Sequence, residues 1–126
     1  TWIDAGIEPH AIGVAARSGS LAKEAKEALR TRGIPTLALT TRSPKSAVRV
    51  GTMHGMKGLE FQAVAVIGVQ DGSVPAISAL TSAETDPVAH AQDLQRERCV
   101  LFVACTRARD HLYVSYAGSP SPFLPG

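Results

Sequence analysis

Short apolar runs alternate with polar, helix-like stretches along the chain, and this alternation predicts a layered α/β domain. Residues 11–16 (AIGVAA) and 63–69 (AVAVIGV) contain no charged side chain, as expected for strands buried on both faces of a parallel sheet. Shorter runs at 36–39, 48–53 and 111–116 are further strand candidates. We therefore expect a mostly parallel sheet in which residues 63–69 form a central strand.

Two other segments suggest helices. From residue 21 to 32 apolar side chains recur at helical spacing, with N-cap residues at 18–20 and Gly33 as the C-cap. Residues 91–108 are ambiguous, because CVLFVAC suits a strand whereas the charged lead-in DLQRER and the apolar spacing favour a helix. We expect a helix that is buried along most of its length. Residues 76–89 are polar and are expected to form an irregular connection, and the element order predicts helices on both faces of the sheet.

The size and composition fit one globular domain. The chain has 126 residues, of which 44% are hydrophobic and 19% charged, so it can fold without a disulfide or metal staple. We expect a single domain over residues 1–118 and a flexible Pro-rich tail over 119–126, in a piece of a larger protein. The two cysteines and four scattered histidines predict no metal site. A reducing, cytoplasmic setting is the expectation, because the two cysteines match no secreted disulfide framework. No membrane span is expected, because the apolar runs are short.

The total charge is small, but its distribution along the chain is uneven. The first 60 residues carry nine Lys/Arg and five Asp/Glu, a balance of +4, and the remaining 66 carry four and six, a balance of −2. A basic half could face phosphates, or it could reflect one solvated helix face. No GxxxxGK[ST] or GxGxxG motif is present, so the chain lacks a phosphate-binding loop of its own.

Polar side chains interrupt the apolar pattern at residues 51–61, GTMHGMKGLEF. The preceding strand delivers Thr52 and His54 to its carboxyl end, where parallel sheets bind ligands. Lys57 and Glu60 then project from a tight turn that contains Gly58. The alternative is a polar loop with solvated charges.

A second polar feature follows the apolar part of the later helix. Arg107 is expected at the edge of the domain, where its guanidinium can form bidentate contacts with a phosphate. A structural ion pair with Asp110 or Glu97 is equally compatible with the sequence. Glu97 and Arg98 could likewise pair within the helix.

These two stretches resemble known helicase motifs. Residues 52–61 (TMHGMKGLEF) resemble motif V, and residues 97–108 (ERCVLFVACTRA) resemble motif VI, of the UvrD/Rep/PcrA-type superfamily 1 helicases. Residues 12–34 are similar to the strand and helix that open the second half of this motor domain. The resemblance implies the C-terminal RecA-like lobe, a P-loop NTPase-type α/β fold without its own Walker A loop.

The resemblance also implies roles for individual residues. In this family two RecA-like lobes clamp ATP, and the first lobe holds the Mg²⁺ ion. Arg107 matches the arginine that reaches the γ-phosphate, and Gly58 and Glu60 match positions beside the nucleotide. The positions implied to contact DNA are Thr52, His54, Lys57 and, less strongly, Arg17. The implied partners are single-stranded or partly duplex DNA and the N-terminal RecA-like lobe of the same protein.

One departure from the best-known members concerns a large accessory domain. Those members insert it before motif V, whereas here only residues 40–47 separate two predicted strands, as in compact members of the superfamily. The function implied is the second motor lobe of an ATP-dependent DNA helicase, inactive as an isolated fragment. The alternatives are a non-catalytic RecA-like module that binds nucleic acid or protein, and a flavodoxin-like small-molecule domain.

Overall fold

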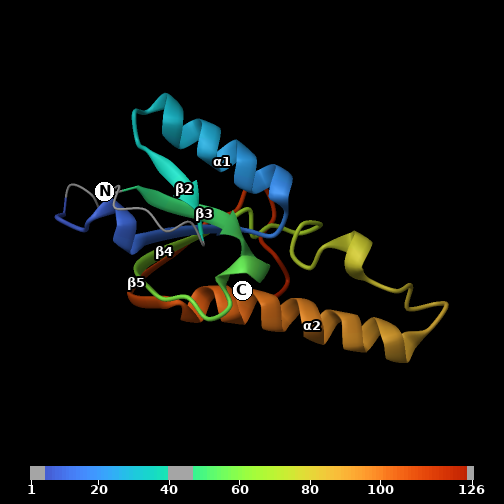
Figure 1. Cartoon of the computed structure of the whole chain (residues 1–126). Helices are drawn as coiled ribbons and strands as arrows, with labels where there is room; N and C mark the ends of the chain where they lie inside the picture. Colours follow the sequence, from blue (N-terminus) through green and yellow to red (C-terminus); the bar gives the residue numbers. More distant parts are fainter. Residues whose placement is uncertain (1–4, 40–46, 125–126) are drawn as a thin grey trace.

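Five parallel strands form the centre of the molecule, which we describe from a computed structural model over residues 5–39 and 47–124 (Figure 1). The strands lie in the order β2-β3-β1-β4-β5, and every neighbouring pair is parallel. Their bounds are β1 Ile12–Ala16, β2 Thr36–Ala38, β3 Val48–Thr52, β4 Phe61–Ile67 and β5 Ala108–Val114. The predicted parallel sheet is confirmed, and the predicted short link at 40–47 lies almost wholly outside the described residues.

Helices cover both faces of this sheet, as the sequence predicted. Helix α1 (Gly19–Thr31) packs on one face and helix α2 (Pro87–Thr106) on the other (Figure 1). Three short 3₁₀ turns complete the described elements: η1 Pro9–Ala11, η2 Met53–Met56 and η3 Ile77–Ala79. β1 leads through α1 to the edge strand β2, and β4 leads through α2 to the opposite edge strand, β5.

The sheet separates two apolar layers. On the α1 side the strands contribute Ile12, Val14, Val48 and Val50. On the α2 side buried residues of the sheet meet Leu101 and Ala104 of the helix. All five residues of β1 are buried, which explains why its sequence carries no polar side chain.

The structure corrects several predicted boundaries. β5 begins at Ala108, three residues before the predicted strand at 111–116, because α2 already ends at Thr106. β4 begins at Phe61, two residues before the predicted start, because Phe61 already pairs with Ala108 of β5. α2 begins at Pro87, inside the stretch predicted to be an irregular connection. Proline is favourable at the first helical position, and the Asp86 carboxylate caps the helix by accepting from Ala89 N–H at 3.0 Å.

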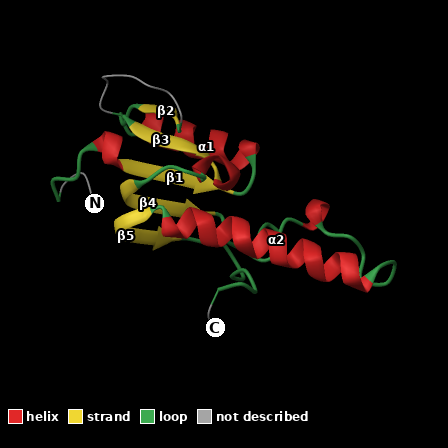
Figure 2. Ribbon diagram, turned by 60° about the horizontal axis from the view of Figure 1, so that its bottom comes forward, coloured by secondary structure: helices red, strands yellow, loops and turns green. Residues whose placement is uncertain are grey.

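The prediction that the second helix is buried along most of its length was wrong. Within α2 only Glu97, Leu101 and Ala104 are fully buried. The first half of the helix extends past the strands into solvent (Figure 2). The apolar run CVLFVAC therefore does not mark continuous burial, and Phe102 in its middle is 67% exposed.

The C-terminal segment differs from the flexible tail that the sequence suggested. Ser121 is 2% exposed, its N–H donates to Val69 O at 3.0 Å, and its hydroxyl donates to Val74 O. Phe123 lies 4.7 Å from the guanidinium carbon of Arg98, measured to the ring centroid. Residues 119–124 thus pack against the loop after β4, and residues 125–126 lie outside the described part.

Within residues 5–39 and 47–124, no helix is both long enough and apolar enough to cross a bilayer.

Candidate nucleotide and nucleic-acid site

The segment from Thr52 to Glu60 alternates between buried and exposed side chains. Met53 and Met56 are 1% and 0% exposed, because the tight turn η2 places side chains three residues apart on one side, against the core. His54 and Lys57 follow these methionines and are exposed. The methionines anchor the turn, and the two polar side chains remain accessible to a ligand.

The residues of this segment that were predicted to contact DNA line two different hollows. Thr52 lines a hollow of about 630 Å³ between α1 and the end of β3, which Lys23 and Lys26 also line. His54 and Lys57 line a groove of about 260 Å³ against α2. The structure therefore brings His54 and Lys57 together and places Thr52 on the other side of the turn.

A glycine redirects the chain from this turn into β4. Gly58 has φ +79°, a left-handed backbone conformation that other residues rarely adopt. A Cβ atom at this position would meet no atom within 4 Å, so the dihedral angle, and not crowding, favours glycine. Glu60 follows on the surface immediately before the strand begins.

One backbone hydrogen bond joins the two motif-like stretches. The N–H of Phe61 donates to the carbonyl of Arg107 at 3.0 Å, so Glu60 approaches the C-terminal end of α2. Arg107 is the C-cap of this helix, and its Nε donates to Val103 O at 3.2 Å. Its Nη2 donates to Thr106 Oγ1 at 3.2 Å, and neither contact uses Nη1. The predicted nucleotide-binding residues thus gather where β4 and β5 begin.

The carboxylates considered as partners of Arg107 are engaged elsewhere within the described part of the chain. Asp110 Oδ2 lies 3.7 Å from Arg109 Nε, and Glu97 forms an ion pair with Arg17. Arg98, the other partner considered for Glu97, donates to Gln95 Oε1 at 3.2 Å.

Arg17 and Glu97 form a bidentate ion pair over 80 positions of sequence. Arg17 Nε donates to Glu97 Oε1 and Nη2 to Oε2, both at 2.8 Å, with side chains 19% and 5% exposed. The N–H of Ala76 donates to the same Oε1 at 2.8 Å. Burial raises the pKa of Glu97, but the hydrogen bonds from Arg17 and Ala76 outweigh it, and the pKa lies below the ordinary glutamate value. Arg17, a predicted phosphate contact, is therefore already paired with a carboxylate.

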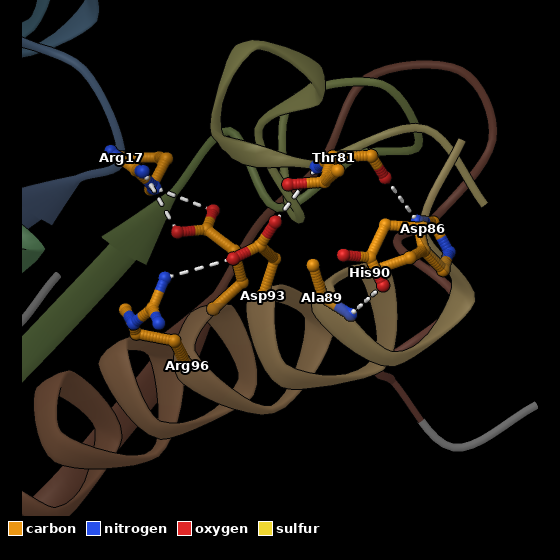
Figure 3. A network of polar contacts seen from close by, with 8 residues as sticks. Arg17, Thr81, Asp86, Ala89, His90, Asp93 and Arg96 are labelled. Carbon is orange, nitrogen blue, oxygen red and sulfur yellow. Dashed lines mark hydrogen bonds and ion pairs between the residues drawn. The ribbon is translucent and has the colours of Figure 1, made fainter.

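Three side chains of α2 form hydrogen bonds with the connection between β4 and α2. These residues are His90, Asp93 and Glu97, and we call them the α2 clasp. Asp93 accepts from Thr81 N–H at 2.7 Å, and His90 Nδ1 lies 2.8 Å from Thr81 O (Figure 3). The hydroxyl and backbone N–H of Thr81 lower the pKa of Asp93. Sequence reasoning missed the clasp, although its positions 90, 93 and 97 follow the spacing of one helix face.

Across residues 5–39 and 47–124, no group of three or more His, Cys, Asp or Glu side chains lies close enough together to hold a metal ion.

Known proteins resemble this chain in both sequence and fold. Residues 37–119 match the family model of the UvrD-like helicase C-terminal domain. YjcD of Bacillus subtilis is 43% identical over 74 residues, which are 59% of this chain and 9% of YjcD. The ATP-dependent DNA helicases UvrD2 of Mycobacterium tuberculosis and PcrA of Staphylococcus aureus are each 39% identical over 75 residues, 60% of this chain and 10% of each helicase.

A solved structure supports the fold over nearly the whole chain. The C-terminal domain of a possible DNA helicase from Lactobacillus plantarum has a TM-score of 0.67 at 23% identity, covering 97% of this chain and 64% of that one. This similarity confirms the RecA-like α/β fold, including the strand and helix before residue 37. The chain spans about a tenth of the length of the full-length relatives it matches. Because the family model covers more than half of its residues, the chain belongs to the UvrD-like helicase C-terminal domain family.

Proposed function

We propose that this chain is the second motor lobe of an ATP-dependent DNA helicase or translocase. In this proposal Arg107 completes an ATP site shared with a preceding RecA-like lobe, and the turn after β3 contacts single-stranded DNA. The observation that carries the proposal is the hydrogen bond from Phe61 N–H to Arg107 O, which brings the two motif-like stretches together.

The surroundings of Arg107 suit a phosphate ligand. Its guanidinium is held by two contacts with the last turn of α2, so it is positioned without a carboxylate that would neutralise it among the described residues. A cation fixed in this way stabilises charge on a transferred phosphoryl group. The exposed Glu60 carboxylate can accept hydrogen bonds from ribose hydroxyls, and Gly58 offers backbone without a side chain. Mg²⁺ is assigned to the preceding lobe.

The exposed side chains of the turn suit a DNA backbone. His54 and Lys57 can bind phosphates from one groove, and the Thr52 hydroxyl can bind one from the other hollow. Arg17 would have to leave Glu97 to reach a phosphate, so we give it the smallest share of DNA binding.

Replacing Arg107 tests the ATP part of the proposal. In the full-length protein Arg107→Ala should lower the DNA-stimulated ATPase rate by roughly 10³-fold or more, because one positioned arginine contributes that much to phosphoryl transfer. The affinity for single-stranded DNA without nucleotide should stay unchanged. The measurement is a steady-state ATPase assay with saturating oligo-dT.

Arg109→Ala is the matched control, because Arg109 is an exposed arginine two residues away that pairs with Asp110. Full ATPase activity after Arg107→Ala would defeat the assigned role. A wild-type protein that binds DNA but hydrolyses no ATP would instead support the non-catalytic module. The isolated 126-residue chain, folded by circular dichroism, should hydrolyse no ATP.

A further inference from the structure

The groove between η2 and α2 has one wall that the proposed function leaves unassigned. Its volume is about 260 Å³, and α2 contributes four of its seven lining residues. The lining residues are Met53, His54, Lys57, Arg96, Cys99, Val100 and Val103. Three of these carry basic side chains and none carries a carboxylate, so the groove complements a polyanion.

A hydrogen bond to Asp93 on the same helix orients the side chain of Arg96 at this groove. Its side chain is 69% exposed, and its Nη1 donates to Asp93 Oδ1 at 2.9 Å. Asp93 is itself fixed by the N–H of Thr81 (Figure 3), so the guanidinium is steered while its Nε and Nη2 lie outside that bond. Such a group can bind a phosphate oxygen without a large loss of side-chain entropy.

The floor of the groove is apolar. Met53 is buried, and Val100 and Val103 are half-buried on the α2 side. Apolar atoms between cationic side chains suit a single strand, whose sugars and bases can contact the floor while its phosphates meet the cations.

From these observations we infer that a single DNA strand passes from the turn after β3 onto α2, and that Arg96 binds one of its phosphates opposite Lys57. This inference rests on the proposed function only in naming DNA as the polyanion. It adds to the contact surface Arg96, which lies outside both motif-like stretches, and the groove-facing Cys99, Val100 and Val103 of α2, to which no DNA contact was assigned.

Replacing Arg96 by glutamine tests the added contact in the full-length protein. Arg96→Gln should weaken binding of fluorescent oligo-dT about five- to tenfold at low salt, and the slope of log K against log salt should fall by about 0.7. Arg109→Gln is the control, because it also removes an exposed arginine beside an aspartate and should change neither value. Equal thermal unfolding of the two variants checks the fold. An affinity for Arg96→Gln equal to that of Arg109→Gln overturns the inference.

Lys57→Gln in the same assay separates this inference from the proposed function. If Lys57→Gln weakens binding and Arg96→Gln does not, only the α2 wall is wrong. If neither variant weakens binding, the DNA role of the turn fails as well. Lower ATPase activity with unchanged DNA affinity after Arg96→Gln would mean that Arg96 supports ATP hydrolysis and does not bind DNA, which also overturns the inference.

Cys99 offers a second readout that needs no substitution. It is exposed and lines the groove, whereas Cys105 is half-buried and burial raises the pKa of its thiol. Saturating oligo-dT should slow iodoacetamide labelling of Cys99, measured on its peptide by mass spectrometry, and leave the slow labelling of Cys105 unchanged. Unprotected Cys99 in the complex would contradict a strand in this groove.

Discussion

A single buried carboxylate, Glu97, joins three segments that are distant in sequence. It lies on α2, pairs with Arg17 at the end of β1 and accepts the N–H of Ala76 from the connection after β4. Burying a carboxylate costs free energy unless donors compensate it, and here three hydrogen bonds do so. His54 adds a further favourable charge interaction, so Glu97 also lies within electrostatic reach of the turn after β3.

Glu97→Gln should lower the free energy of unfolding of the chain by about 1–3 kcal/mol at pH 7, because it leaves the Arg17 guanidinium without a charged partner. The pKa of Glu97 is lower in the folded than in the unfolded chain. Its contribution is therefore complete above the ordinary value of 4.5 and is lost as the pH falls through the lower folded value. The measurement is urea unfolding at several pH values between 7 and 3.

The control for this variant is Glu27→Gln, which removes an exposed pair with Arg30 at 3.8 Å and should cost less than about 1 kcal/mol. The two proteins should differ most at pH 7 and converge in acid. A constant difference across the whole pH range would contradict the linkage.

The sequence allowed some of these residues to be predicted and not others. The position of Thr52, His54 and Lys57 at and just after the end of a strand was predictable because they interrupt apolar runs, whereas their contact with DNA stays a prediction. The partner of Glu97 was not, because Arg98 and Arg107 were nearer in sequence than Arg17. The choice between them depends on how α2 lies on the sheet, which local pattern does not encode.

The packing of β1 against β4 helps to position the residues near Arg107. Gly13 of β1 pairs with Val64, and a Cβ atom there would lie 2.8 Å from Cδ2 of Phe61. The absent side chain thus lets the Phe61 ring pack on the strand. Phe61 also donates to Arg107 O, so this packing supports the junction of the two motif-like stretches.

Gly13→Ala should destabilise the chain by about 1–3 kcal/mol, because an aromatic ring cannot yield as a flexible side chain can. In the full-length protein it should also lower ATPase activity, since Phe61 shifts with Glu60. The control is Gly19→Ala in α1, where a Cβ atom would meet nothing within 4 Å. Urea unfolding and ATPase assays check both effects, and a Gly13→Ala variant as stable as Gly19→Ala would contradict the packing argument.

Elements were predicted well where burial is complete and poorly where it changes along the segment. The charge-free run at 11–16 predicted the buried strand β1, whose two sides face apolar layers. The run at 63–69 was expected to be central; it forms the inner strand β4, and β1 takes the middle of the sheet. The start of α2 was missed because Pro87 suggests a break, although it suits the first helical turn. Its burial was overestimated because apolar composition says nothing of where the sheet ends.

At the scale of the whole molecule, the segment 52–61 connects the two ends of the parallel strands. It leaves β3 at the carboxyl end, beside the predicted DNA contacts, and enters β4 at the amino end, beside Arg107. Both buried methionines of η2 pack in the core under α2, so the segment and the helix are coupled through one apolar layer. If both proposed sites bind their ligands, we predict that this packed segment couples them.

His54→Ala in the full-length protein tests this coupling. We expect the variant to keep its ATPase activity at saturating DNA but to translocate about five- to tenfold more slowly, because one phosphate contact worth about 1–1.4 kcal/mol is lost at the DNA edge. The measurement pairs stopped-flow translocation with ATPase under the same conditions. His10→Ala, at an exposed position in η1 next to the amino end of β1, is the control. Equal losses of ATPase and translocation would place His54 in the nucleotide site, and no loss of either would remove it from the motor.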